Sequence, residues 1–158
     1  MSPAVQDRRN SQSDAAGGKS TNAASDKSFG ARNGGAGGES RIACFQVLRL
    51  VDNGRYLDEA LRQARQLPDR DRRFVRLLAA TCLRRAGQID SILADLMSRQ
   101  PSGKQRDAVI ILRMGAAQLL FLDTGAHAAV NSTVELMRSS GFDRLTGLTN
   151  AAVSYTHL

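Results

Sequence analysis

The length, composition and charge of the chain indicate one small basic domain. The chain has 158 residues and a net charge of +7, and 42% of its residues are hydrophobic but only 4% are aromatic. This length suits a single compact domain with a tail. Two cysteines far apart in the sequence argue against a disulfide-stapled secreted protein, so we expect a reducing cytoplasm. The longest apolar run, residues 108–122, contains Arg113 and Gln118 and is shorter than the roughly 20 residues that a bilayer requires, so no membrane partner is expected.

The first forty residues differ in composition from the rest of the chain. They contain seven Gly, seven Ser and seven Ala, without the period of a helix or a strand. Such a segment cannot bury enough apolar surface to offset the entropy lost on ordering. The sequence therefore predicts a disordered tail over residues 1–40, followed by a folded domain over residues 41–151.

From Arg41 onward the apolar spacing is helical, and no alternating segment is long enough for a strand. The fifth helix is apolar almost all round, so it should lie at the centre of the fold, and Gly115 should let a neighbouring helix approach closely. We expect an all-α bundle of about six to seven helices. The expected ranges are about 41–51, 56–66, 69–85, 88–99, 105–122 and 126–140, with a last helix starting near Arg144.

The third helix carries the clearest pattern. Asp69 is expected to cap its free N–H groups after Pro68, and Gly87 is expected to end it. On a helical wheel its arginines share an arc of roughly 120°, opposite the apolar residues. The outward residues are Arg72, Arg73, Arg76 and Arg84, and the inward residues are Phe74, Val75, Leu78 and Cys82.

These arginines allow two interpretations. A charge run usually only solvates a helix face. Phosphate contact is favoured here because a planar guanidinium can grip two phosphate oxygens or stack on a base. The charge is also concentrated, since residues 41–113 carry fifteen basic and eight acidic side chains, whereas residues 114–158 carry two and three. We therefore predict an RNA partner.

Three further basic residues are weaker candidates for the same surface. Lys104 and Arg106 open the fifth helix, where free backbone N–H groups also favour an anion, and Arg41 starts the first helix. The aromatic residues available for stacking on bases are Tyr56 and Phe74, and Phe74 faces inward. Contacts to the RNA backbone and to its shape should therefore dominate over base reading.

Groups that could carry catalysis are sparse. His127 has no acid–base partner at helical spacing, so a helix-start or packing role is expected, and Glu135 and Asp143 are isolated carboxylates. Cys82 lies on the packed side of its helix, where burial should raise the pKa of the thiol and suppress its reactivity. We therefore expect no catalytic residue, no metal site and no cofactor in this chain.

Four strings of the sequence carry a resemblance to a known family. They span Arg84–Asp90, Gly115–Phe121, His127–Asn131 with Val134–Leu136, and Gly147–Ala151. In their order and spacing they resemble the NusB-like domain that precedes the catalytic domain of bacterial 16S rRNA cytosine-C5 methyltransferases, the RsmB family. The resemblance covers roughly Arg41 to Ala151. It implies an all-helical NusB fold, an RNA-binding role and S-adenosylmethionine chemistry in a Rossmann-like domain after Leu158.

The chain departs from the family pattern at two places. The family usually has proline just before the histidine, where this chain has Gly125 and Ala126, so a looser entry into that helix is expected. Residues 152–158 do not continue the family pattern, and we interpret them as a truncated or misassembled end.

Our first hypothesis is an RNA-binding module that positions a methyltransferase on 16S rRNA and is not itself an enzyme. The alternatives are a freestanding NusB-type transcription antitermination factor and a helical protein-interaction domain whose arginines only keep it soluble.

Overall fold

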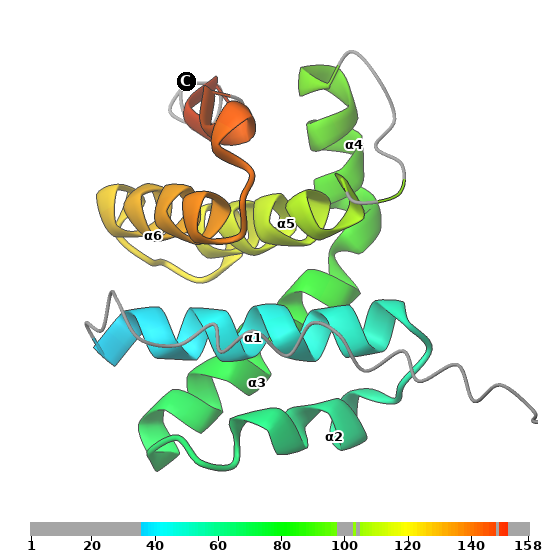
Figure 1. Cartoon of the computed structure of the whole chain (residues 1–158), viewed down its shortest axis with the longest axis vertical. Coiled ribbons are helices and arrows are strands. Elements are labelled where there is room, and N and C mark those ends of the chain that lie inside the picture. The colour runs from blue at the N-terminus through cyan, green and yellow to red at the C-terminus, as the bar shows by residue number, and fades with distance from the viewer. Residues whose placement is uncertain (1–35, 98–102, 104, 148, 152–158) are drawn as a thin grey trace, which may run out of the picture. The chain divides into compact units, whose positions relative to one another are not determined.

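The computed structural model describes residues 36–97, 103, 105–147 and 149–151 (Figure 1). Most of the predicted disordered tail, Lys104 and the atypical residues 152–158 lie outside this part. All regular elements in the described ranges are helical, which confirms the predicted all-α class. The elements are α1 (Ala36–Asp52), α2 (Leu57–Ala60), the 3-10 helix η1 (Leu61–Ala64), α3 (Asp69–Arg84), α4 (Ala86–Leu96), α5 (Gln105–Phe121), α6 (Ala126–Ser139) and the 3-10 helix η2 (Asp143–Leu145).

Helix α5 lies at the centre of this arrangement, as predicted. It contacts α1, α3, α4 and α6, while α1 packs along α3 (Figure 1). Both apolar and small side chains of α5 are buried, because the helix has neighbours on most sides. The fully or almost fully buried residues of α5 include Ala108, Ile110, Ile111, Leu112, Met114 and Ala117.

The closest helix contact joins α5 to α6. A Cβ atom at Gly115 would lie 2.7 Å from Thr133 Oγ1 and 2.9 Å from its Cγ2, closer than unbonded atoms of these types approach. Thr133 is buried and donates its hydroxyl to the carbonyl of Ala129 at 2.7 Å, which fixes the side chain in place. The predicted close approach at Gly115 is therefore confirmed.

Helix α1 begins earlier than predicted, at Ala36 instead of Arg41, so five residues assigned to the tail are helical. The glycines at 37 and 38 disfavour a helix by about 1 kcal/mol each relative to alanine. Burial of Ser40 and a hydrogen bond within the helix favour the helical conformation here. Ser40 is only 1% exposed, and Arg41 donates an Nη1 hydrogen bond to the carbonyl of Gly37 at 2.7 Å.

The second predicted helix, residues 56–66, is divided into α2 and η1. Its predicted inward side is confirmed, because Ala60 and Ala64 are each 1% exposed and Leu57 and Leu61 are half-buried. The prediction of one regular α-helix is wrong, since the second half adopts the tighter 3-10 geometry that is common at helix ends.

Two predictions about the ends of α3 are also wrong. Pro68 occupies the N-cap position without a side-chain hydrogen bond, and the Asp69 carboxylate accepts a hydrogen bond from Arg72 instead of capping backbone N–H groups. Gly87 does not end α3. The helix ends at Arg84, and Gly87 lies in the first turn of α4. The burial of apolar side chains further along α4 sets the direction of the chain after Arg85, and a glycine without contacts cannot do so.

No helix in the described ranges is both long enough and apolar enough to cross a membrane.

Candidate nucleic-acid interface

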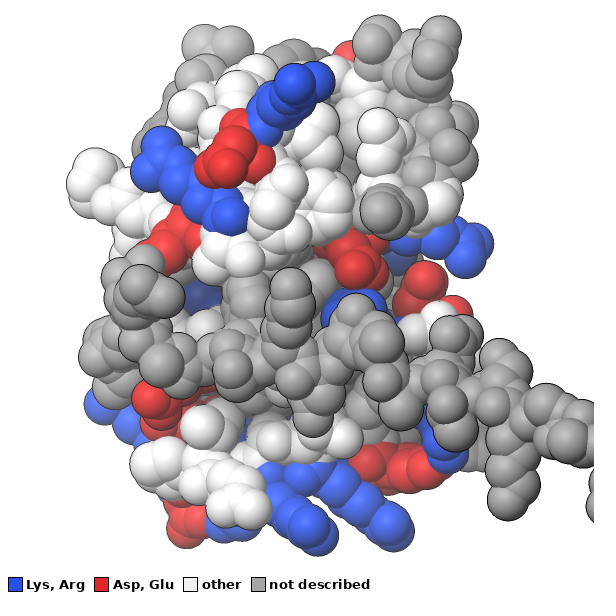
Figure 2. All heavy atoms as spheres, viewed as in Figure 1, with Lys and Arg blue, Asp and Glu red and all other residues white. Residues whose placement is uncertain are grey.

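The outer face of α3, defined as Arg72, Arg73, Arg76 and Arg84, is exposed along its whole length. The opposite side of the helix is buried through Val75, Leu78, Ala79 and Cys82, while Phe74 is half-buried. The predicted inward and outward residues are therefore confirmed, but α3 also exposes two apolar side chains, Leu77 at 54% and Leu83 at 40%. Figure 2 shows basic side chains projecting where α2 and the start of α3 lie, with acidic side chains beside them.

Two of these arginines have carboxylate partners. Arg72 pairs with Asp69 one turn earlier, and Arg76 Nη2 lies 3.3 Å from Oδ1 of Asp58 in α2. The two carboxylates are 72% and 87% exposed. Pairs this exposed contribute about 0–1 kcal/mol, so a phosphate can replace the carboxylate at little cost.

The other two arginines of this face make no ion pair with a described residue. Arg73 donates an Nε hydrogen bond to the carbonyl of Asp69 at 3.3 Å, which leaves its terminal nitrogens accessible. Arg84 lies twelve residues after Arg72, or about 18 Å along the helix axis. The outer face of α3 therefore has three arginines near its start and one at its end, with exposed Leu77 and Leu83 between them.

Arg41 lies in a different environment. Its Nε donates to Gln118 Oε1 at 2.7 Å, and its guanidinium carbon lies 5.3 Å from the centroid of the Phe74 ring. Burial lowers the pKa of Arg41 from its ordinary value. Since Gln118 belongs to α5 and Phe74 to α3, the side chain joins three helices. This geometry fits a structural role better than a phosphate contact.

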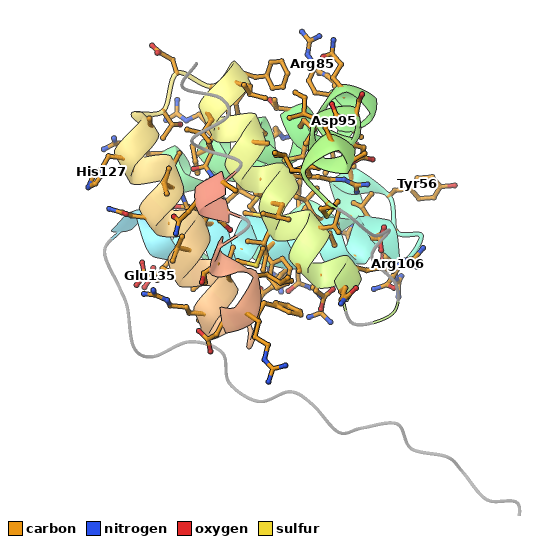
Figure 3. All side chains as sticks on the ribbon, turned by 90° about the horizontal axis from the view of Figure 1, so that it is seen from above. Tyr56, Arg85, Asp95, Arg106, His127 and Glu135 are labelled. Carbon is orange, nitrogen blue, oxygen red and sulfur yellow. The ribbon has the colours of Figure 1, made fainter. Side chains whose placement is uncertain are left out.

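Arg106 is exposed in the first turn of α5, and Lys104 lies outside the described residues. An ion pair of 3.2 Å between Arg49 and Asp107 ties this end of α5 to the last turn of α1. Figure 3 shows Arg106 near one end of α5 and Arg85 near the other. The 17 residues of α5 span about 25 Å, so the predicted site residues do not form one compact patch.

Sequence reasoning missed an exposed pair at the other end of α5. Phe121, the last residue of this helix, is 36% exposed, and the guanidinium carbon of Arg85 lies 5.1 Å from its ring centroid. The available signal was the all-round apolar character of α5, because the last residue of such a helix extends beyond its neighbours. The aromatic residues that the sequence offered, Tyr56 and Phe74, are respectively 84% exposed and covered by Arg41.

Helix α6 borders an open depression of about 680 Å³. Sequence reasoning treated Glu135 as isolated, but the structure places it here beside Arg138. The spacing of Asn131, Glu135 and Arg138 on one helix side was a signal for this grouping. His127 is exposed as the second residue of α6, which supports the predicted helix-start role and not a packing role. The depression is lined by Val130, Asn131, Val134, Glu135, Arg138, Ser139 and Asn150.

The thiol of Cys82 is buried, as predicted, and so is that of Cys44. Burial raises the pKa of Cys82 to about 12 and the pKa of Cys44 well above its ordinary value. Both groups therefore stay protonated near neutral pH and are poor nucleophiles. Within the described ranges, no three His, Cys, Asp or Glu side chains converge on a position for a metal ion.

Comparison with known proteins identifies the family. The chain matches the NusB family over residues 38–154 and belongs to that family, which confirms the resemblance. No solved structure matches significantly.

Curated relatives of the chain include several proteins named ribosomal RNA small subunit methyltransferase B. The protein of Vibrio cholerae is 35% identical over 112 residues, which cover 70% of this chain and 26% of the relative. The protein of Xanthomonas campestris is 35% identical over 128 residues, which cover 78% of this chain and 29% of the relative. The protein of Vibrio vulnificus is 36% identical over 115 residues, which cover 72% of this chain and 27% of the relative. The chain therefore spans little more than a quarter of the length of these relatives.

Proposed function

We propose that this NusB-family domain binds RNA through the outer face of α3 and positions a methyltransferase on 16S rRNA. The observation that carries the proposal is the set of four exposed arginines on one side of a helix whose opposite side is buried. The names of the relatives supply the substrate class, because each is a methyltransferase for small-subunit ribosomal RNA. Bacterial cytoplasm, where ribosomes are made, is the proposed location.

We assign the chemistry to the part of the relatives that this chain does not cover. Methylation of a cytosine at C5 needs S-adenosylmethionine and, in the proposed catalytic domain, a reactive thiol. The thiols described here do not fit that role, since burial keeps both protonated. The relationship to methyltransferases also favours this proposal over a freestanding transcription antitermination factor.

The proposal is tested by changing Arg72, Arg73 and Arg76 together to glutamine. Affinity for a 16S rRNA fragment at low salt should fall about tenfold or more, because three phosphate contacts are lost and fewer counterions are released on binding. For the same reason, the slope of log affinity against log salt should become shallower by about two to three. Filter binding over a salt series measures both quantities.

A control removes charge elsewhere. Arg138 and Arg144 are exposed on α6 and η2 and make no ion pair with a described residue. Changing these two to glutamine should reduce affinity by less than about threefold, through the weaker long-range field alone. Unchanged binding of the α3 variant, or an equal loss in both variants, would refute the assignment of the interface.

A further inference from the structure

The end of α5 presents an aromatic ring with an arginine guanidinium over it. Arg85 is exposed, its guanidinium carbon lies 5.1 Å from the Phe121 ring centroid, and its Nη1 donates to Gln88 Oε1 at 3.1 Å. The ring supports one side of the guanidinium, and the amide holds one of its edges. The opposite side of this cation is left available to a ligand.

Arg85 has no carboxylate partner, unlike two of the arginines on the outer face of α3. Neither Arg84 nor Arg85 lies within ion-pair distance of a described carboxylate, whereas Arg72 and Arg76 both do. The acidic residue closest in sequence to Phe121 is Asp123, which is exposed and makes no ion pair with a described residue. A ligand therefore finds a preorganised and uncompensated cation at this end of α5.

The ends of α3 and α5 also expose apolar side chains. Leu120 is 36% exposed and Leu83 is 40% exposed, one residue before Phe121 and Arg84 along their helices. A phosphate alone gains nothing from exposed leucine and phenylalanine. A nucleotide does, because its base is flat and apolar on both faces while its phosphate is anionic.

We propose that Arg85 and Phe121 form a base-stacking site for one unpaired nucleotide of the bound RNA. The base stacks on the outer side of the Arg85 guanidinium, whose inner side lies on Phe121, and Arg84 contacts the adjacent phosphate. This proposal rests on the proposed RNA-binding function and adds a preference for single-stranded RNA. Because Arg84 belongs to both sites, a strand that follows the outer face of α3 reaches the stacking site at the end of that helix.

The test compares the binding of two fluorescein-labelled ligands by fluorescence anisotropy. The salt concentration is low, about 50 mM, because binding to nucleic acid weakens as salt rises. One is a single-stranded oligoadenylate of about twelve nucleotides, and the other has the same ribose-phosphate chain without bases. The full chain should bind the oligoadenylate about tenfold more tightly, the gain expected from stacking of one base. Phe121→Ala and Arg85→Lys should each reduce this ratio to about two or less, since the lysine keeps the charge but lacks the plane.

Arg144→Ala is the matched control, because it removes an exposed arginine on η2. It should weaken binding of both ligands equally and leave their ratio unchanged. Equal binding of the two ligands by the unchanged chain would overturn the stacking site while leaving the RNA-binding function intact, and would favour a protein contact for the exposed apolar residues. A ratio preserved in Arg85→Lys would also overturn it, even if Phe121→Ala fails to fold. If neither ligand binds, the 16S rRNA fragment decides: binding of that fragment would overturn the stacking site alone, and no binding would contradict the proposed function itself.

Discussion

The contact between α5 and α6 has no free space at Gly115, whereas the outer face of α3 meets solvent and a few exposed carboxylates. At the first region, atoms of Thr133 occupy the volume that a side chain at Gly115 would need. At the second, Arg73 and Arg84 are exposed and could change side-chain conformation without moving a neighbour. The difference indicates that substitutions at the α5–α6 contact change stability, and that substitutions on the face of α3 change binding.

The largest effect is expected for Gly115→Ala. The new Cβ would lie 2.7 Å from Thr133 Oγ1, and this side chain is buried and hydrogen-bonded, so the helices must separate slightly. We expect the free energy of unfolding to fall by about 1–3 kcal/mol, as for other overpacked cores. Urea denaturation followed by circular dichroism measures the change.

A second glycine provides the control. Gly87 is exposed in α4, and a Cβ there would meet no atom within 4 Å. Gly87→Ala should therefore raise stability by about 0.5–1 kcal/mol through helix propensity. Adding Thr133→Ala to Gly115→Ala should recover part of the loss, because it removes the two closest atoms. Similar effects of Gly115→Ala and Gly87→Ala would show that α5 and α6 are not in close contact.

An intermediate effect is expected for Arg41→Ala. This variant tests whether an arginine that packs between helices affects stability and not RNA binding. The substitution leaves Oε1 of Gln118 without this donor, in a side chain that is 1% exposed, and it uncovers Phe74. We expect the free energy of unfolding to fall by about 1–2 kcal/mol. RNA affinity, measured under conditions where the variant stays folded, should change by less than about twofold.

Arg84→Ala is the counterpart on the surface. It should leave the free energy of unfolding within about 0.5 kcal/mol and weaken RNA binding, because Arg84 is exposed and makes no ion pair with a described residue. If Arg41→Ala weakened RNA binding as much as Arg84→Ala, Arg41 would be a ligand contact in addition to its structural role.

The same contrast explains how much of the molecule the sequence could predict. The inward and outward sides of α3 follow from a period that any helix of this sequence must present, so Val75 and Arg76 could be assigned correctly. The tight contact at Gly115 could be predicted because a glycine in a helix that is apolar almost all round allows a neighbouring helix to pack closely.

Features that depend on distant residues could not be predicted. The hydrogen bond from Arg41 to Gln118 joins positions 77 residues apart, and no local pattern shows that it supports a helix beginning at Ala36. The position of the Arg85 guanidinium over the Phe121 ring likewise depends on how the start of α4 and the end of α5 pack. The end of α3 was predicted to within one residue, but the role of Gly87 was wrong because glycine is a common helix stop, whereas Gly87 lies within α4 here.

The smallest effect is expected for Asp58→Asn, which removes the ion pair between α2 and α3 without changing the size of the side chain. Since Asp58 is 87% exposed and its partner Arg76 is 66% exposed, stability should fall by no more than about 0.5 kcal/mol. RNA affinity at low salt should rise about two- to threefold, because Arg76 is released and one negative charge leaves the outer face of α3. Filter binding with the same 16S rRNA fragment measures the gain.

Asp95→Asn separates the two causes of that gain. Asp95 is exposed on α4 and makes no ion pair with a described residue, so its removal changes the net charge equally but releases no arginine of α3 (Figure 3). RNA affinity should rise less for Asp95→Asn than for Asp58→Asn, and raising the salt concentration should reduce the gain in both variants. Equal gains in the two variants would mean that Arg76 contributes only through the overall field of the protein, and the phosphate contacts would then have to lie at Arg72, Arg73 and Arg84.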